Sequence, residues 1–305
     1  MESFKVHILG CGSALPTLRH NASAQVVELR DKMFMIDCGE GTQIQLRRSR
    51  VSFSRIGHVF ISHLHGDHCF GLIGMISTFG MLGRTAPLHV HAPAELQPIL
   101  EVEMQAYCQG LEYKVEFHAI DTAATTVIYE DRSLTVTTIP LEHRMPCCGF
   151  LFREKPTLPH IRRDMIDFYH IPVCHIANIK NGADWTTVDG SVVPNSRLTF
   201  PADPPRSYAY CSDTRYMPKL HKLVEGATVL YHESTYDKAC ADRAKLYYHS
   251  TSEQAAKVAR AAGVGKLVLG HFSARYENEQ TILDEAVAIF PNTVLANEGI
   301  VIDVK

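Results

Sequence analysis

Residues 63–68, His-Leu-His-Gly-Asp-His, place three imidazoles and one carboxylate within six residues. Imidazole nitrogens and carboxylate oxygens suit zinc, manganese or iron, and they suit copper(I) poorly. On an extended backbone His63 and His65 point to the same side, whereas Gly66 allows a sharp turn that directs Asp67 and His68 elsewhere. Two diverging pairs of ligands predict a site for two metal ions. The alternative, a solvent-facing turn that happens to be rich in histidine, does not explain four ligands directly after a strand.

The loop follows His58–Ser62, which predicts a buried strand because the run is β-branched and aromatic and ends in a turn signal. Three more candidate ligands stand at or shortly after the end of a predicted strand: His143 after Ser133–Ile139, Asp213 after Ser207–Cys211, and His271 after Lys266–Gly270. Seven donors can satisfy two metal ions if one carboxylate bridges them and water fills an open position. An open position indicates catalysis, since structural zinc sites are closed and mostly rich in cysteine.

Asp37 also ends a predicted strand, Met33–Ile36, and the sequence leaves two roles open for it. Its carboxylate can support a metal ligand through a hydrogen bond. It can equally cap the helix that follows.

Two further segments predict helices. Cys69–Leu82 is apolar and predicts one buried helix after the histidine loop. Ser252–Ala262 predicts another, with Ser250 or Thr251 as the N-cap and Glu253 reaching back to it.

Composition bounds the class of protein. The chain has 305 residues, of which 46% are hydrophobic and 21% charged, enough for one large domain or two coupled halves. A formal net charge of −3 excludes a global basic field, although a local basic patch suffices to bind RNA. The nine cysteines are scattered, odd in number and without a C-x-x-C pair, which favours thiols in a reducing cytosol. We find no signal-peptide pattern in residues 1–20 and no apolar run of 18 residues, and we expect a soluble cytoplasmic protein.

The composition changes at Arg153. Residues 153–182 hold five Lys or Arg against three Asp or Glu, together with three prolines and three histidines. Prolines frame a short predicted helix, Ile161–Phe168. We therefore expect a protruding basic arm, with an ordinary surface insertion as the alternative.

Several motifs occur together and in a fixed order: His-x-His-x-Asp-His at 63–68, His143, Ser212-Asp213-Thr214, His232-Glu233-Ser234-Thr235, Tyr248-His249-Ser250-Thr251 and His271-Phe272-Ser273-Ala274-Arg275-Tyr276. This combination resembles ribonuclease Z, the short-form tRNA 3′-end-processing endonuclease of the metallo-β-lactamase superfamily. The resemblance runs from about Phe4 to Val304. The histidine loop alone is typical of the superfamily, whereas the His-Glu-x-Thr and His-Ser-Thr segments and the basic arm are more specific to the family.

The resemblance implies an α/β fold, the αβ/βα four-layer sandwich, with residues 1–305 as one domain and residues 153–182 as an inserted arm that binds tRNA. It implies two Zn²⁺ per subunit, for which Mn²⁺ or Fe²⁺ can substitute. One ion would be held by His63, His65, His143 and Asp213, and the other by Asp67, His68, Asp213 and His271. It also implies a homodimer, precursor tRNA as the partner, and neither a nucleotide cofactor nor a membrane partner.

The implied reaction is zinc-dependent removal of the 3′ trailer from precursor tRNA, leaving a 3′-hydroxyl on the tRNA and a 5′-phosphate on the trailer. Asp67 would accept or orient a proton of the attacking hydroxide while remaining a ligand. His249 is not needed as a ligand and is free to be the general acid, titrating near neutrality, with Glu233 orienting it. The alternatives are another hydrolase of the superfamily, acting on small phosphodiesters, thioesters or lactams, and a non-catalytic RNA-binding protein.

Overall fold

The computed structural model describes residues 3–305, which form two compact units. We call the larger one the body; it comprises the described residues up to 131 together with 135–152 and 207–305. The smaller one, the insert, comprises residues 132–134 and 153–206.

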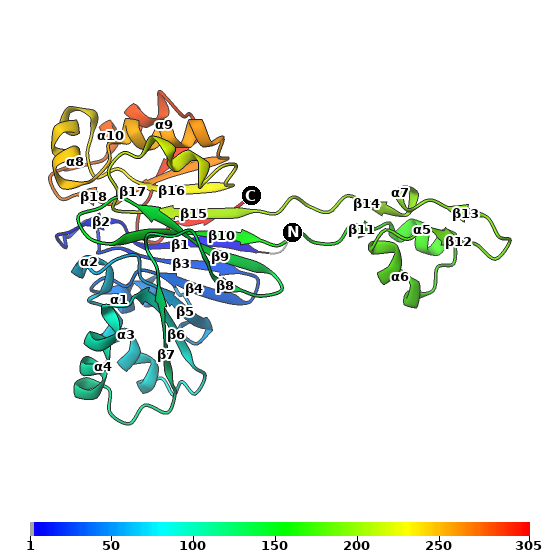
Figure 1. The fold of residues 1–305 in the computed structure, drawn as a ribbon, viewed down its shortest axis with the longest axis horizontal. Coiled ribbons are helices and arrows are strands. Elements are labelled where there is room, and N and C mark those ends of the chain that lie inside the picture. The colour runs from blue at the N-terminus through cyan, green and yellow to red at the C-terminus, as the bar shows by residue number, and fades with distance from the viewer. Residues whose placement is uncertain (1–2) are drawn as a thin grey trace. The chain divides into compact units, whose positions relative to one another are not determined.

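The first sheet of the body has seven strands in the order β20-β1-β3-β4-β5-β6-β7. Their bounds are β1 Phe4–Gly10, β3 Ala24–Leu29, β4 Lys32–Ile36, β5 Ile56–Phe60, β6 Leu88–Pro93, β7 Val115–Ile120 and β20 Val301–Asp303. Strands β4 to β7 run parallel, so their carboxyl ends lie at one edge of the sheet. Helices α1 (Thr42–Arg48), α3 (Leu72–Met81) and α4 (Leu96–Tyr107) lie on the outer face of this sheet (Figure 1).

The second sheet also has seven strands, in the order β19-β17-β16-β15-β10-β9-β8. Their bounds are β8 Val127–Glu130, β9 Leu134–Leu141, β10 Cys147–Glu154, β15 Ser207–Cys211, β16 Val229–Glu233, β17 Lys266–Gly270 and β19 Thr293–Leu295. Strands β15, β16, β17 and β19 are parallel. Helices α8 (Ala241–Tyr247), α9 (Ser252–Ala262) and α10 (Gln280–Val287) cover its outer face (Figure 1).

The two sheets pack face to face through aromatic side chains. Phe34 and Phe60 of the first sheet meet Phe150 and Phe152 of the second, with ring centroids 5.5 to 5.8 Å apart. Removing such rings from water makes the main favourable contribution to the free energy of folding in a layered core of this kind. The helix–sheet–sheet–helix arrangement confirms the predicted αβ/βα sandwich.

Short elements complete the body: β2 (Gly12–Ser13), η1 (Phe53–Arg55), α2 (Gly66–Cys69), η2 (Pro218–Lys222), η3 (Lys238–Cys240) and β18 (Phe272–Ser273). Strands β2 and β18 pair in parallel, which ties the first loop of the chain to the residues that follow His271. This pairing brings the N-terminal loop to the edge where the candidate ligands lie.

The prediction of one helix over 69–82 was wrong, because the structure has α2 and α3 with a break at Phe70 and Gly71. The Gly71 amide donates to the carbonyl of Cys38, and a Cβ at position 71 would lie 2.1 Å from the Gly39 oxygen. The backbone of the preceding loop therefore takes the place where a continuous helix would need room for side chains.

Helix α9 begins as predicted at Ser252, with Thr251 as its N-cap. The residue that reaches back is Gln254 rather than Glu253, and it forms a capping box with Thr251. In a capping box the N-cap residue exchanges hydrogen bonds with the third residue of the helix. With Thr251 as the N-cap, that third residue is Gln254.

The insert has its own small hydrophobic core, formed by Ile171, Ile179, Val193 and Leu198. Its elements are β11 (His160–Ile161), α5 (Arg163–Phe168), α6 (Val173–Lys180), β12 (Trp185–Thr186), β13 (Val192–Val193), α7 (Asn195–Leu198) and β14 (Thr199–Phe200). Because Val193 and Leu198 belong to that core, the unit extends beyond the 153–182 segment expected from composition, to Arg206.

The added residues also change the charge of the segment. Residues 153–206 carry seven Lys or Arg and six Asp or Glu, so the excess of basic residues is smaller than over 153–182.

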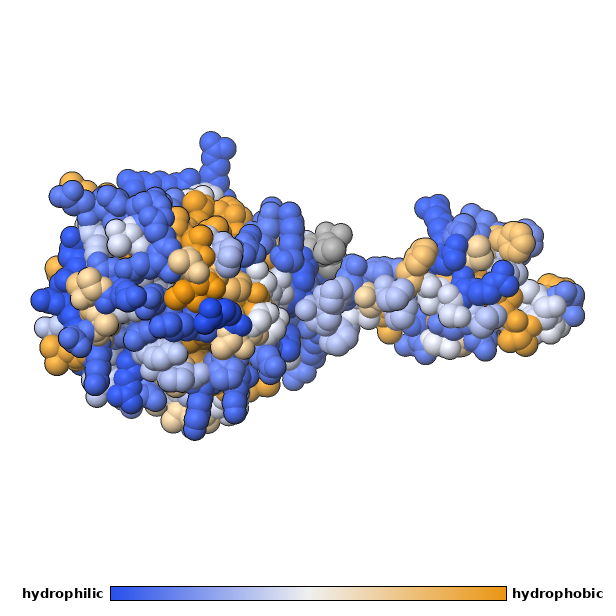
Figure 2. Space-filling view, turned by 90° about the horizontal axis from the view of Figure 1, so that it is seen from above, coloured by the Kyte–Doolittle hydropathy of each residue, from blue (hydrophilic) through white to orange (hydrophobic). Residues whose placement is uncertain are grey.

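Hydrophilic side chains cover most of the visible face of each unit (Figure 2). Within the described residues, every helix is too short or too polar to cross a lipid bilayer.

Candidate metal centre

The first group of donors joins the loop after β5 to two loops of the second sheet. His63 Nε2 lies 3.1 Å from His65 Nδ1, and His143 Nε2 lies 3.2 Å from the same His65 atom. Asp213 Oδ1 is 3.9 Å from His63 Nε2 and 3.8 Å from His143 Nε2. Three nitrogens and one oxygen thus converge on one point, as ligands of a tetrahedral metal site do.

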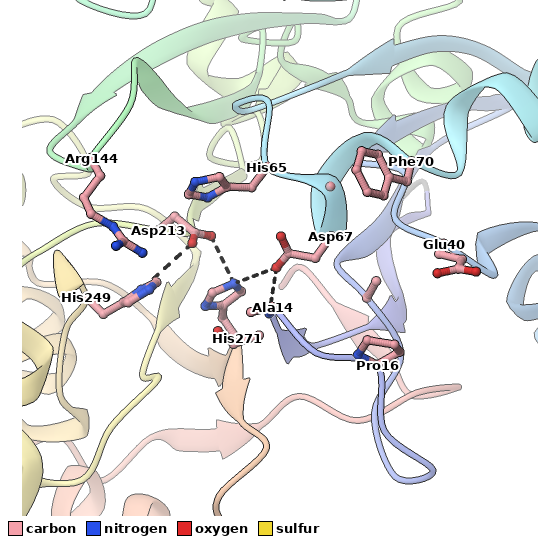
Figure 3. A pocket seen from close by; sticks show the side chains of 13 residues that line it. Ala14, Pro16, Glu40, His65, Asp67, Phe70, Arg144, Asp213, His249 and His271 are labelled. Carbon is pink, nitrogen blue, oxygen red and sulfur yellow. Dashed lines mark hydrogen bonds and ion pairs between the residues drawn. The ribbon is translucent and has the colours of Figure 1, made fainter. Parts of the chain in front are cut away.

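The second group converges on the other oxygen of the same carboxylate. Asp213 Oδ2 lies 3.0 Å from His68 Nε2 and 3.1 Å from His271 Nε2. Asp67 Oδ2 is 3.5 Å from His68 Nε2. The same oxygen is 3.7 Å from His271 Nε2 (Figure 3). All seven candidate ligands therefore lie together, with Asp213 between the two groups.

Hydrogen bonds on the far side of the rings hold His68 and His271 with their Nε2 atoms directed at the centre. Thr235 donates its hydroxyl hydrogen to Glu233 Oε2, so its oxygen accepts the Nδ1–H of His271 at 3.0 Å. His68 Nδ1 donates to Asp37 Oδ2 at 2.7 Å. The Nε2 atoms of His68 and His271 are buried without a hydrogen-bond partner.

A nitrogen lone pair and a carboxylate oxygen repel each other at short distance. Because the Nε2 atoms of His68 and His271 lie 3.0 and 3.1 Å from Asp213 Oδ2, a positive charge is needed between these nitrogens and the oxygen. Burial lowers the pKa of His68, but the carboxylates of Asp213, Asp37 and Asp67 outweigh burial and hold that pKa well above its usual value. The site therefore favours a cation. A donor set of imidazole nitrogens and carboxylate oxygens fits a divalent metal ion.

Asp37 supports the centre from behind. Its carboxylate is fully buried and accepts hydrogen bonds from the Ser62 amide at 2.8 Å, the Tyr210 hydroxyl at 2.7 Å and His68 Nδ1. Gly41, not Asp37, occupies the N-cap of the following helix α1. Of the two roles left open by the sequence, the supporting one is confirmed and the capping one is wrong.

Asp37→Asn should weaken metal binding by about 10- to 100-fold, the usual effect of removing a partner that orients a metal-binding histidine. The amide keeps the shape of the side chain but loses the charge that fixes the proton on His68 Nδ1. Competition with a chromophoric chelator measures the change. Asp31→Asn, at an exposed turn, is the matched control and should bind metal normally. Equal affinities of the two variants would contradict the supporting role.

His249 and Glu233 form a buried pair beside the metal ligands. Glu233 Oε1 accepts from His249 Nδ1 at 2.9 Å and from the Thr214 amide at 2.7 Å. Burial lowers the pKa of His249, but the Glu233 carboxylate more than compensates and raises it to about 9. This pKa is higher than the near-neutral value expected from sequence, and it keeps the imidazole protonated at neutral pH.

A cavity of about 400 Å³ opens over the centre, and its lining includes His65, Asp67, Asp213, His249 and His271 (Figure 3). Sequence reasoning assigned no role to two other lining residues, Ala14 and Arg144. The Ala14 amide donates to Asp67 Oδ2 at 2.8 Å and so orients that carboxylate. Neither residue carries a motif signal, since one acts through its backbone and the other is a single arginine after His143. Thr235 was missed as well, although it belongs to the quoted His-Glu-x-Thr segment.

Several site residues have a backbone that non-glycine residues adopt only at a cost. Asp37, Asp213 and His271 have φ angles of 55°, 59° and 60°. Such left-handed conformations cost about 1 kcal/mol or more each, and they cluster at functional sites. Each of these three residues follows a strand, so the turn directs its side chain across the end of the sheet.

A helix–sheet–sheet–helix sandwich with histidine and aspartate loops at one edge defines a metallo-β-lactamase-fold protein. The family model described as Anti-Pycsar protein Apyc1 matches residues 4–159, which include the histidine loop and His143 but not Asp213, Glu233, His249 or His271. A structure of YhfI from Bacillus subtilis, a metallo-β-lactamase fold protein, is similar with a TM-score of 0.69 at 19% identity, covering 99% of this chain and 100% of that one.

Full-length relatives narrow the class. Ribonuclease Z of Bacteroides fragilis strain ATCC 25285 is 61% identical, with 99% of each chain covered, and ribonuclease Z of Porphyromonas gingivalis strain W83 is 49% identical, covering 99% of this chain and all of that one. The short form of human tRNase Z has a TM-score of 0.71 at 26% identity, with 99% of each chain covered. The chain belongs to the ribonuclease Z family.

Proposed function

We propose that this chain is a metal-dependent endoribonuclease that removes the 3′ trailer from precursor tRNA, leaving a 3′-hydroxyl on the tRNA and a 5′-phosphate on the trailer. The observation that carries the proposal is the complete set of seven donors, six of them around Asp213, with the His249–Glu233 pair beside it. The names of the full-length relatives support the choice of substrate.

We propose that the centre holds two Zn²⁺ ions, one on each group of donors: His63, His65, His143 and Asp213 for the first, and Asp67, His68, Asp213 and His271 for the second. When bound, two divalent ions supply positive charge for the phosphodiester and acidify a water molecule. Asp213 contributes one oxygen to each group, which supports a shared ligand.

The remaining chemistry belongs to the protein. Asp67, oriented by the Ala14 amide, is placed to accept a proton from the attacking water. His249 is placed to donate a proton to the departing 3′ oxygen of the tRNA, since its pKa of about 9 keeps it charged at neutral pH. Glu233 acts through His249 by holding Nδ1, which leaves Nε2 as the atom that can give up a proton.

End-mapping of a cleaved precursor tRNA tests this proposal. The metal-loaded protein should cut once near the end of the acceptor stem and leave a 3′-hydroxyl on the tRNA. Hydrolysis of a nitrophenyl phosphodiester without cleavage of the precursor would favour the small-substrate hydrolase instead. Binding of the precursor without any cleavage would favour the non-catalytic RNA-binding protein.

The insert is proposed as a tRNA-binding surface. Within residues 156–204 two arginines, Arg163 and Arg197, are exposed, whereas Arg162 pairs with Asp164 at 2.9 Å and stacks on the Phe200 ring. The exposed pair is thus better placed than Arg162 to contact phosphates. Phosphate contacts far from the metals contribute to binding without affecting the chemical step.

Replacing residues 156–204 with a short Gly-Ser bridge should strongly reduce cleavage of precursor tRNA while leaving nitrophenyl phosphodiester hydrolysis intact. Because the insert has a core of its own, its removal takes away a complete unit. The double variant Arg163→Ala with Arg197→Ala should flatten the plot of log affinity against log salt by about one unit per lost phosphate contact. An unchanged tRNA affinity and salt slope would identify the insert as decorative, and equal losses on both substrates would indicate a folding role.

We also propose a homodimer that works in the cytoplasm. Helices α1 and α3 expose Ile44, Met81 and Leu82 around one shallow groove, with side chains 56%, 77% and 54% exposed. Grouped apolar side chains of this kind favour contact with another protein surface. Met81→Asp should shift the protein towards monomer in light-scattering measurements, whereas Val173→Asp, an exposed apolar site in the insert, should not. A monomeric wild-type protein would exclude the dimer.

A further inference from the structure

Four histidines lie together on the inner face of the first sheet, separate from the metal centre. The strand register places His58 of β5 opposite His89 of β6, and His91 of β6 opposite His118 of β7. Glu116, on β7, lies opposite His89. Alternation along each strand sends all five side chains to one face, so three strands contribute to one cluster.

The imidazoles form two stacked layers. His58 Nδ1 lies 3.1 Å from His91 Nε2, and His89 Nδ1 lies 3.0 Å from His118 Nε2. The His58 ring stacks on His89 and the His91 ring stacks on His118, each with centroids 4.6 Å apart and planes within 15° of parallel. His91 is buried and His118 is exposed, so the pair of His89 and His118 forms the outer layer.

The outer layer also has a carboxylate. Glu116 Oε2 lies 3.4 Å from His89 Nδ1, the same nitrogen that faces His118. A single hydrogen on His89 Nδ1 can form a good hydrogen bond with either His118 Nε2 or Glu116 Oε2, but not with both. Two nitrogens and one oxygen at 3.0 and 3.4 Å reproduce the donor spacing of the candidate metal centre, where His63, His65 and His143 nitrogens lie 3.1 and 3.2 Å apart.

We propose that His89 Nδ1, His118 Nε2 and Glu116 form a separate binding site for one divalent transition-metal ion, with water completing the coordination. Two imidazoles and a carboxylate are the ligand types that Zn²⁺ binds in open sites. His58 and His91 form the floor of the site and hold the outer rings in place by stacking. A bound ion would join the edge strand β7 to β6.

Elemental analysis after equilibrium dialysis against micromolar free Zn²⁺ tests the proposal. The double variant His89→Ala with His118→Ala should bind one Zn²⁺ fewer per chain than the wild type, and Glu116→Gln should weaken the same equivalent. The matched control, His160→Ala with His170→Ala, removes two other exposed histidines and should bind as many ions as the wild type. The readout is a difference of one equivalent, so it does not depend on how many ions the main centre holds.

Unchanged nitrophenyl phosphodiester hydrolysis by the double variant would show that the fold and the main centre are intact. If the double variant keeps the additional equivalent, or if the control loses it as well, the proposed site is wrong. If the wild type binds no more Zn²⁺ than the double variant, the histidine pairs are ordinary N–H···N hydrogen bonds and the proposal is overturned.

Discussion

Asp213→Ala should lose both metal ions and, with them, all measurable hydrolysis of precursor tRNA. The carboxylate is buried and presents Oδ1 to His63 and His143 and Oδ2 to His68 and His271. Removing it takes one ligand from each group and leaves the five imidazoles without the carboxylate that lies between the two groups. His63→Ala removes a ligand from one group only, so it should weaken mainly one ion. Elemental analysis of the purified variants measures both outcomes.

Position 213 needs a second variant, because its φ of 59° is unfavourable for alanine whether or not metal is involved. Asparagine tolerates this backbone region well. Asp213→Asn should therefore fold like the wild type by circular dichroism and still bind metal poorly, since a neutral amide cannot bridge two cations as a carboxylate does. Near-stoichiometric double occupancy in Asp213→Ala would refute the bridge.

His249→Ala should retain its metals and its affinity for precursor tRNA, and its kcat should fall by about 100- to 10,000-fold, the usual contribution of a general acid. The departing 3′ oxygen of a ribose is a poor leaving group and needs a proton. A nitrophenolate needs little protonation, so hydrolysis of a nitrophenyl phosphodiester should decrease far less. Single-turnover assays with the two substrates separate these effects.

Glu233→Gln provides an independent variant for the same role. Glutamine fits the space of Glu233 but removes the charge that raises the pKa of His249. We expect it to show the same substrate-selective loss as His249→Ala. His221→Ala, a histidine outside the cavity, is the matched control and should leave both activities unchanged. Equal losses on the two substrates would remove His249 from the role of acid.

The seven candidate ligands could be located from sequence because each follows a strand whose apolar pattern is visible in the chain. The assignment of these residues to two groups came from the resemblance to ribonuclease Z, because the strands they follow belong to two different sheets. The directions of the imidazole protons could not be predicted in this way. They depend on contacts between distant residues, such as His68 with Asp37 and His271 with Thr235.

The parts that were missed depend on pairing register or on packing between segments. The second cluster takes His58 from β5, His89 and His91 from β6 and His118 from β7, and only the alignment of these strands brings them together. The extent of the insert was missed because composition detects charge, whereas the boundary is set by the packing of Val193 and Leu198. The roles of His249 and Glu233 remain predictions that the variants above will test, and the role of Asp67 remains a prediction as well.

The position of the shared carboxylate along the chain has a consequence for biosynthesis. A ribosome makes the histidine loop first, Asp213 afterwards and His271 later still. The first group of donors cannot be complete before Asp213 emerges, and the second must also await His271. Because chains emerge from their N-terminus, an unfinished polypeptide has no complete centre. Hydrolytic activity therefore requires that synthesis has passed His271.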